Sequence, residues 1–214
     1  MKGFGDIYKS EKKKNKKNKF SNKQIINQAI QLHLKGNIRE AKKHYEQIIK
    51  QGCNDDKVFS NYGAILQGMG KLKDADTSYR KAIELNPDYA IAYSNLGGVL
   101  RDIGNLKEAE IYTRKAIELN PDIEDAHSNL GVILHDLDNL NEAEISLRRA
   151  IKLNPKYSVA YTNLGDLLFN LGNSKEAFDL YLKGIEIDPT LSNVYPKISK
   201  FLEDADLTKL NNSK

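Results

Sequence analysis

The fold is decided by the stretch AIAYSNLGGVLRDIGNLKEAEIYTRKAIELNPDI, residues 90–123. Apolar residues recur in it at steps of three and four, which is the spacing of one helix face and not the alternation of a strand. Gly104 breaks the series and suits a turn with positive φ, and Asn120 precedes a proline and therefore avoids the α region. The stretch therefore predicts two helices joined by a tight turn. Their apolar positions are Tyr93, Leu96, Leu100, Ile103, then Ala109, Tyr112, Ala116 and Leu119.

The same pattern occurs five times at a spacing of 34 residues, without an insertion. Aligned alanines mark it at Ala41, Ala75, Ala109, Ala143 and Ala177, which gives the units 22–55, 56–89, 90–123, 124–157 and 158–191. The eighth residue of each unit is small, so that two helices can approach closely: Ala29, Gly63, Gly97, Gly131 and Gly165. The fifteenth is glycine in four units and Asp138 in the other, as expected for a left-handed turn residue. Units of this kind bury their apolar faces by stacking on their neighbours.

The two ends of the chain differ from this body. Residues 1–23 hold nine lysines and two acids, a net charge of +7, which leaves −3 for the rest of a chain of net charge +4. Because so few apolar residues lie there, we expect a disordered lysine-rich tail over residues 1–21. The 34-residue numbering of the units, called the grid below, continues into residues 192–206, where we expect a capping helix. We expect a frayed terminus at 207–214. We expect Lys197, Lys200, Glu203 and Asp204 on the outer, polar face of that helix.

These positions, present in every copy, resemble the tetratricopeptide repeat (TPR), and the resemblance covers residues 22–191. It implies an all-α fold, a right-handed α-solenoid of five helix-turn-helix units with a C-terminal capping helix. It also implies that first helices line a concave face and second helices a convex face.

The residues contain no constellation typical of an enzyme. The four histidines do not form a metal-binding spacing, and the lone Cys53 occupies the place of a loop proline. There is no phosphate-binding glycine motif and no run of about 20 apolar residues that could cross a bilayer. We predict a non-catalytic chain with no cofactor, no metal and no small-molecule substrate. The single cysteine and the lack of a secretory signal favour a cytoplasmic location.

An asparagine stands at the sixth position of every unit: Asn27, Asn61, Asn95, Asn129 and Asn163. Asparagine is a poor helix former, so five in register indicate a role other than helix stability. A side-chain amide offers both donors and an acceptor, and a row of them can bind the main chain of an extended peptide. The row can equally form hydrogen bonds between adjacent helices, or reflect an asparagine-rich gene. The residues that directly precede these asparagines are Ile26, Ser60, Ser94, Ser128 and Thr162.

We predict that the partners are other proteins, bound as extended segments along this asparagine ladder. Neighbouring polar residues would tune side-chain preference: Arg101, Asp102, His135, Asp136 and Asn170. The phrases AYSNLG (92–97) and AHSNLG (126–131) resemble the TPR arm of O-linked N-acetylglucosamine transferases. That resemblance implies peptide binding, and the alternative function of a substrate-recognition arm for a transferase whose catalytic part is not in this chain.

Two other binding modes are weaker. A carboxylate clamp for acidic chain ends matches at Lys23, Asn27 and Asn61, but Ile91 and Asn95 stand where cations are needed. The +7 tail could contact nucleic acid or an anionic membrane weakly, or simply keep the protein in solution.

Overall fold

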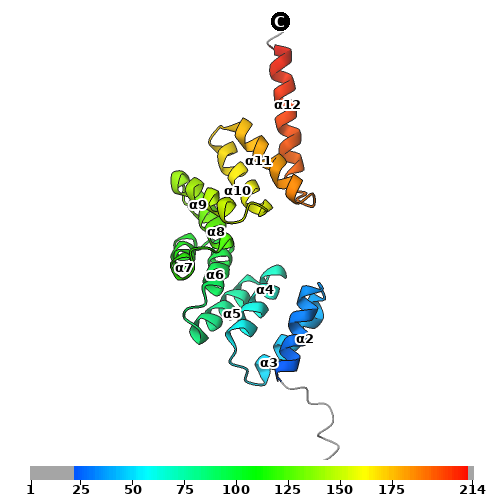
Figure 1. The fold of residues 1–214 in the computed structure, drawn as a ribbon, viewed down its shortest axis with the longest axis vertical. Coiled ribbons are helices and arrows are strands. Elements are labelled where there is room, and N and C mark those ends of the chain that lie inside the picture. Colours follow the sequence, from blue (N-terminus) through cyan, green and yellow to red (C-terminus); the bar gives the residue numbers. More distant parts are fainter. Residues whose placement is uncertain (1–21, 212–214) are drawn as a thin grey trace, which may run out of the picture.

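The computed structural model describes residues 22–211, and within that span every regular element is a helix (Figure 1). The predicted tail at residues 1–21 and the last three residues, 212–214, lie outside the described part of the chain. The helices are α2 (Asn22–Leu34), α3 (Ile38–Lys50), α4 (Asp56–Gly68), α5 (Leu72–Leu85), α6 (Ala90–Ile103), α7 (Leu106–Leu119), α8 (Glu124–Asp136), α9 (Leu140–Leu153), α10 (Ser158–Asn170), α11 (Ser174–Ile187) and α12 (Tyr195–Asn211).

The turn between the two helices of each unit has the predicted left-handed residue. The φ values are 76° at Gly36, 71° at Gly70, 91° at Gly104 and 82° at Gly172. The fourth unit has Asp138 at the same place, with φ of 62°. The backbone reverses there so sharply that the residue after the turn donates its N–H back into the first helix.

The small eighth residue also has the predicted role. A Cβ atom on Gly131 would lie 2.5 Å from Leu147 Cγ, and one on Gly165 would lie 2.6 Å from Tyr181 Cε1. Such distances are far below van der Waals contact, so a side chain would force the two helices of the unit apart. The short approach is what lets each pair share one buried cluster.

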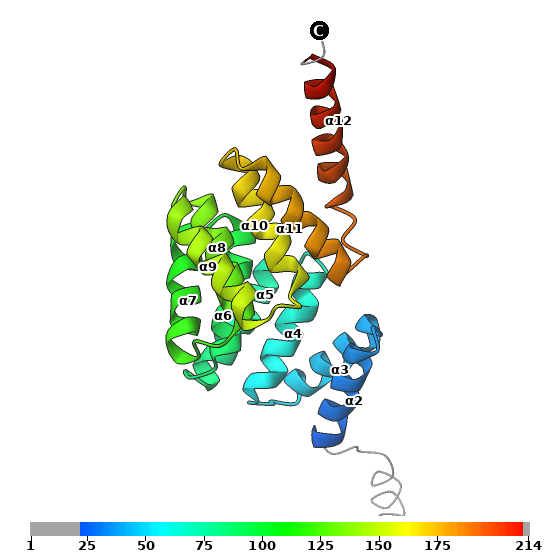
Figure 2. The same ribbon diagram turned by 45° about the horizontal axis from the view of Figure 1, so that its top comes forward.

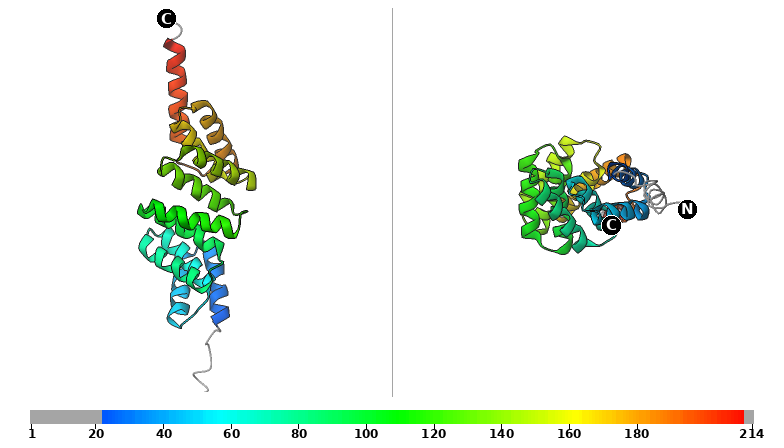
Figure 3. Two further views of the ribbon diagram at one scale, coloured as in Figure 1. Left: turned by 90° about the vertical axis from the view of Figure 1, so that its left-hand side faces the viewer. Right: turned by 90° about the horizontal axis from the view of Figure 1, so that it is seen from below.

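The helix pairs stack into an α-solenoid. Each second helix packs against the first helix of the next unit, and first helices contact one another in series from α4 through α6 and α8 to α10. In Figure 1 the stack curves, with α6 and α8 on the inner side of the arc and α7 and α9 on the outer side. Figure 3 shows the units layered along the long axis of the molecule. The boundaries between units remain a sequence prediction, because a turn does not fix the residue at which one unit ends.

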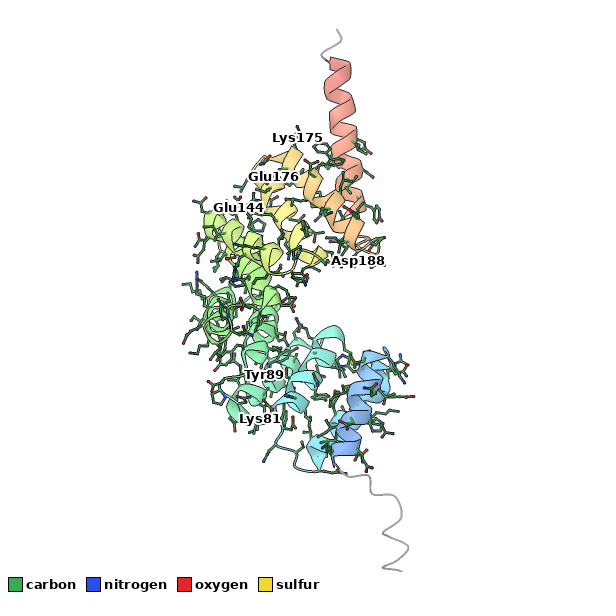
Figure 4. The ribbon with its side chains drawn as sticks, viewed as in Figure 1. Lys81, Tyr89, Glu144, Lys175, Glu176 and Asp188 are labelled. Atoms are coloured by element: carbon green, nitrogen blue, oxygen red, sulfur yellow. The ribbon has the colours of Figure 1, made fainter. Side chains whose placement is uncertain are left out.

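Ion pairs connect the second helices on the outer side. Arg80 bonds Glu108 at 2.7 Å, Arg114 bonds Glu142 at 2.7 Å and Arg148 bonds Glu176 at 2.8 Å. Each arginine also binds an acid four residues before it in its own helix. Figure 4 shows Glu144 and Glu176, the two partners of Arg148, on the outer side of the arc.

The first unit is attached less firmly than the others. At the position of these arginines it has Glu46, which pairs with Lys42 of its own helix. Helix α3 packs less extensively on α4 than α5 does on α6, α7 on α8 or α9 on α10. The unit has its own buried cluster, which includes Tyr45 and Ile48 and extends to Val58 and Ile65 of α4.

The last helix, α12, is longer than predicted. It runs to Asn211, past the predicted boundary at 206, and so includes part of the segment 207–214. The reason is that residues 197–211 contain no glycine or proline that would stop a helix. Phe201 stacks on Phe178 of α11 with ring centroids 4.4 Å apart, and the helix projects beyond the solenoid (Figure 2). In the described part of the chain, no helix is long and apolar enough to cross a membrane.

Candidate functional site

A hollow of about 670 Å³ opens on the inner side of the last three units. It is lined by first helices α6, α8 and α10 and closed at one end by α12. Six of the ten predicted site residues line it: Arg101, Asn129, His135, Asp136, Asn163 and Asn170.

Two rungs of the asparagine row are fixed by hydrogen bonds to the preceding first helix. Asn129 Nδ2 donates to Ser94 Oγ at 3.2 Å and to the main-chain oxygen of Ser94 at 3.3 Å. Asn163 Nδ2 donates to Ser128 Oγ at 3.1 Å. A carbonyl oxygen only accepts, so the atom of Asn129 that faces Ser94 is the amide nitrogen. The interpretation in which these asparagines bond adjacent helices is therefore correct for Asn129 and Asn163.

The other three asparagines do not lie in this hollow. Asn27 is exposed at the first unit, and Ile26, which stands 35 residues before Asn61, has no hydroxyl to bond it. Asn61 faces the phenol of Tyr45, whose pKa is raised by burial and partly lowered again by that amide. Asn95 lines a separate hollow of about 230 Å³ with Ile91 and several acids. The five asparagines therefore share a register but do not form one continuous site.

The predicted tuning residues connect the first helices along the rim of the hollow. Arg101 Nε donates to Asp136 Oδ2 at 2.7 Å, which joins α6 to α8. Asn170 Nδ2 and His135 Nε2 are 3.0 Å apart, which joins α10 to α8. Asp102 is 3.7 Å from Arg101 and does not line the hollow. These contacts connect α6, α8 and α10 on one side of the asparagine row, six or seven residues C-terminal to it in each helix.

The wall formed by α12 was missed from the sequence. Lys197 and Lys200 line the hollow, so the expectation that they lie on an outer polar face is wrong. Lys197 bonds Asp166 of α10, and Tyr181 donates to the same carboxylate at 2.7 Å. The Lys197 ammonium also lies 5.4 Å from the centre of the Tyr181 ring. Burial and the neighbouring Asp166 raise the pKa of Tyr181, so its hydroxyl stays protonated and donates.

A signal for Lys197 was present in the sequence. It stands 34 residues after Asn163, which is the sixth position of the grid extended into α12. Lys200 falls at the ninth position, the place of Val132 and Asp166 in the two preceding units. Both positions face the inner side in the solenoid, and the grid places them there when it is followed past 191.

The hollow also offers apolar surface. Val159 and Phe169 are 39% and 40% exposed, which is high for side chains of their size, and both line it with Val132. Tyr157 contributes a phenol whose pKa is raised by burial and by Asp125. Among residues 22–211, no group of three histidine, cysteine or acidic side chains is placed to hold a metal ion.

Comparisons with known proteins agree with this geometry. Profiles described as TPR repeat and as tetratricopeptide repeat match residues 63–104, 90–123, 124–157 and 146–179. No curated protein matches the chain.

Solved structures resemble it in fold. TTC0263, a thermophilic TPR protein of Thermus thermophilus, aligns with a TM-score of 0.73 at 20% identity over 85% of this chain and 99% of that one. PilW, a type IV pilus biogenesis factor, aligns with a TM-score of 0.74 at 21% identity over 86% and 87%. YrrB, described as a TPR protein with an unusual peptide-binding site, aligns with a TM-score of 0.60 at 22% identity over 86% and 95%.

Proposed function

Because the chain is a tetratricopeptide repeat protein, we propose that it is a non-catalytic interaction module that binds an extended segment of another protein in the hollow between α6 and α12. The repeats serve protein–protein interaction in general. In this chain we place that interaction in the hollow and assign it to main-chain hydrogen bonds.

One observation carries the proposal: two amides at equivalent positions of adjacent helices, Asn129 and Asn163, are oriented alike by serine hydroxyls. Each amide nitrogen is bonded to the preceding first helix, and we propose that the two Oδ1 atoms serve as acceptors. A peptide main chain carries an N–H at every residue except proline, and an extended chain leaves these donors unpaired. Two fixed acceptors therefore bind main chain without reading side chains.

The surroundings of the row suit a peptide in the same way. Val159 and Phe169 offer apolar contact to its side chains, and Lys200 offers an ammonium. The contacts of Arg101 with Asp136 and of Asn170 with His135 hold the helices before a ligand arrives. Such preorganisation lowers the entropic cost of binding. YrrB, a protein of similar fold, has a peptide-binding site of its own.

The test is a selection from a phage-displayed library of random dodecapeptides. Three proteins are compared: the unmodified chain, the double variant Asn129→Ala with Asn163→Ala, and the matched control Asn61→Ala, whose asparagine has the same grid position outside the hollow. We expect selected peptides to bind the unmodified chain and the control alike. Binding to the double variant should fall about tenfold or more, since two hydrogen bonds are lost.

Helical content, measured by circular dichroism, should be the same in all three proteins. Selected peptides that bind the double variant as tightly as the control would contradict the proposal, and so would a selection that enriches nothing.

The alternative of a substrate arm for a separate glycosyltransferase rests on the sequence resemblance at 92–97 and 126–131. It uses the same hollow and the same peptide chemistry. Co-purification of a transferase with the chain is the observation that would favour it.

A further inference from the structure

A second hollow lies on the outer side of the solenoid, between α7 and α9, and has a volume of about 590 Å³. Ile117 of α7 and Leu130 of α8 give it an apolar lining, and Ile145 of α9, which is 69% exposed, stands beside them. Arg114 and Arg149 line it as well. It shares no residue with the hollow of the proposed peptide site, so it is a separate surface.

The repeat shows why this hollow exists. Of its nine lining residues, six are identical to the residues 34 positions earlier: Arg114, Ile117, Glu118, Leu130, Glu142 and Ile145. Two more keep a similar kind of side chain, since Arg149 replaces a lysine and the ring of His127 replaces that of a tyrosine. The ninth is Ser146, which stands where the third unit has Tyr112. The serine therefore leaves open a space that a tyrosine fills one unit earlier.

Tyr112 shows which side chain this place accepts. Its ring lies 5.9 Å from the ring of Tyr93, centroid to centroid, and packs on the buried cluster that includes Leu96. Arg80 Nη1 donates to the Tyr112 hydroxyl at 2.9 Å, and Arg80 Cζ lies 5.2 Å from the centre of the ring. The surroundings therefore bind both the apolar body of a tyrosine and its hydroxyl.

The fourth unit keeps the partners of that side chain. Arg114 bonds the acid four residues before it at 2.8 Å and Glu142 of the next second helix at 2.7 Å. Arg80 has the corresponding distances of 2.9 and 2.7 Å, so the two guanidinium groups are held in the same way. His127 takes the place of the second aromatic ring, and its Nε2 lies 2.9 Å from the main-chain oxygen of Pro121. The frame is present, and the tyrosine is missing.

We infer that the hollow between α7 and α9 binds a tyrosine side chain of a partner protein, which takes the place that Tyr112 has in the third unit. Its hydroxyl accepts a hydrogen bond from Arg114, its ring lies against His127, and Ile145 contacts the residues beside it. Phenylalanine fills the same space but offers no acceptor to the guanidinium, so the site prefers tyrosine. The inference does not depend on the proposed function, because it concerns the opposite side of the solenoid.

A related hollow of about 560 Å³ between α3 and α5 supplies a matched control. Ser78 lines it, at the grid position of Tyr112 and Ser146. Glu46 stands there at the grid position of Arg114, so α3 offers no guanidinium for a tyrosine hydroxyl at that position. Ser78→Tyr therefore fills a hollow of the same kind that lacks the arginine.

The test is a subtractive selection from a phage-displayed library of dodecapeptides with a fixed central tyrosine. The library is first depleted on the Ser146→Tyr protein, in which the hollow is filled, and then selected on the unmodified chain. The Ser146→Tyr protein should keep its helical content by circular dichroism, because the third unit carries a tyrosine in matching surroundings. Enriched peptides are synthesised with a fluorescent label, and their affinities are measured by anisotropy.

We expect enriched peptides to bind the unmodified chain and Ser78→Tyr alike and to lose binding to Ser146→Tyr. Replacing the central tyrosine by phenylalanine should weaken binding about tenfold, the loss of one hydrogen bond to a charged group. That difference should disappear in Arg114→Met, which keeps the length of the side chain and removes the donor. The variant with Asn129→Ala and Asn163→Ala should bind as the unmodified chain does, which separates this surface from the inner hollow.

Three results would overturn the inference: no enrichment, equal affinity for the tyrosine and phenylalanine peptides, or loss of binding in Ser78→Tyr instead of Ser146→Tyr. A synthetic peptide of residues 1–21, which contains Tyr8, tests the chain itself as the source of the tyrosine. If that peptide binds the hollow and the library yields no ligand, the occupant is the chain's own tail and the assignment to a partner protein is overturned.

Discussion

At the scale of single residues, Asp138 is the only non-glycine in the described residues with positive φ, at 62°. The left-handed conformation costs an ordinary L-residue about 1–2 kcal/mol, and aspartate somewhat less. Asp138→Gly should therefore stabilise the fold by about 0.5–1 kcal/mol, after the extra flexibility of glycine in the unfolded chain is subtracted. Urea unfolding followed by circular dichroism measures the change. Gly104→Ala, which places a side chain at φ of 91°, should lower the stability of the fold. A change of stability in the same direction for both variants would contradict this account.

Two glycines on neighbouring first helices should respond oppositely to alanine. At Gly131 the new Cβ would lie 2.5 Å from Leu147 Cγ and 3.1 Å from the main-chain oxygen of Ala143. Gly131→Ala should destabilise by about 1–3 kcal/mol, the usual cost of overpacking. At Gly98 the nearest atom is Asn129 Nδ2 at 3.7 Å, an ordinary contact. Gly98→Ala should stabilise by about 0.5–1 kcal/mol, because alanine is the better helix former.

The same denaturant titration tests both glycine variants, and each serves as the control for the other. If both variants were less stable than the unmodified protein, the helices would also be crowded around Gly98, which would contradict the ordinary contact distance found there.

At the scale of elements, the sequence predicted the helix pairs because two signals agree in every unit. Apolar steps of three and four residues mark the helices, and a glycine or aspartate at the fifteenth position marks the turn. The extent of α12 was not predicted, because residues 197–211 contain no glycine or proline that would mark the end of a helix. The charge of Lys197 predicts solvent exposure, whereas the residue lines the hollow. The grid position was the better guide, since a lysine can cover an aromatic ring such as Tyr181 while it bonds a carboxylate.

For the site, the sequence identified a register but not its partners. It indicated that five asparagines share one face, which follows from the repeat. The residue 35 positions earlier supplies the partner in two cases, since Ser94 bonds Asn129 and Ser128 bonds Asn163, and Ile26 has no hydroxyl to bond Asn61. A hydroxyl at that position is not sufficient, because Ser60 precedes Asn95 in the same way without such a bond among the described residues. This dependence joins residues 35 apart, beyond the reach of a pattern within one helix.

At the scale of the whole molecule, the connections between units are unequal. Arginine pairs bridge the second helices from α5 to α11, and asparagine bonds bridge the first helices from α6 to α10. The first unit lacks the arginine, because Glu46 stands in its place. In a solenoid, stability is the sum of unit and interface contributions, so the unit with the weakest interface opens first.

Among the five helix pairs, α2 to α11, hydrogen exchange should therefore be fastest in α2 and α3 and slowest in α8 and α9, as measured by mass spectrometry of peptic fragments. A charge exchange, Lys42→Glu with Glu46→Arg, reproduces the pattern of the later units, with Asp74 placed to receive the new arginine as Glu108 receives Arg80. It should slow exchange in α2 and α3 by a few-fold, the effect of a partly exposed ion pair of about 0.5–1 kcal/mol. Uniform exchange from α2 to α11, or no response to the charge exchange, would contradict the account.

In each hydrogen bond of the asparagine row, the donor lies in a later unit than the acceptor, so the acceptor is synthesised first. During synthesis at about 5–20 residues per second, a unit of 34 residues takes about 2–7 seconds to emerge. The helix that bears Ser94 is therefore complete when Asn129 emerges, and the helix that bears Ser128 is complete when Asn163 emerges. Each new amide meets an acceptor that is already in place, and the proposed binding surface is assembled one asparagine at a time in the order of translation. Its last wall is added with α12, so a nascent chain that stops before Lys197 has oriented asparagines but an unfinished hollow.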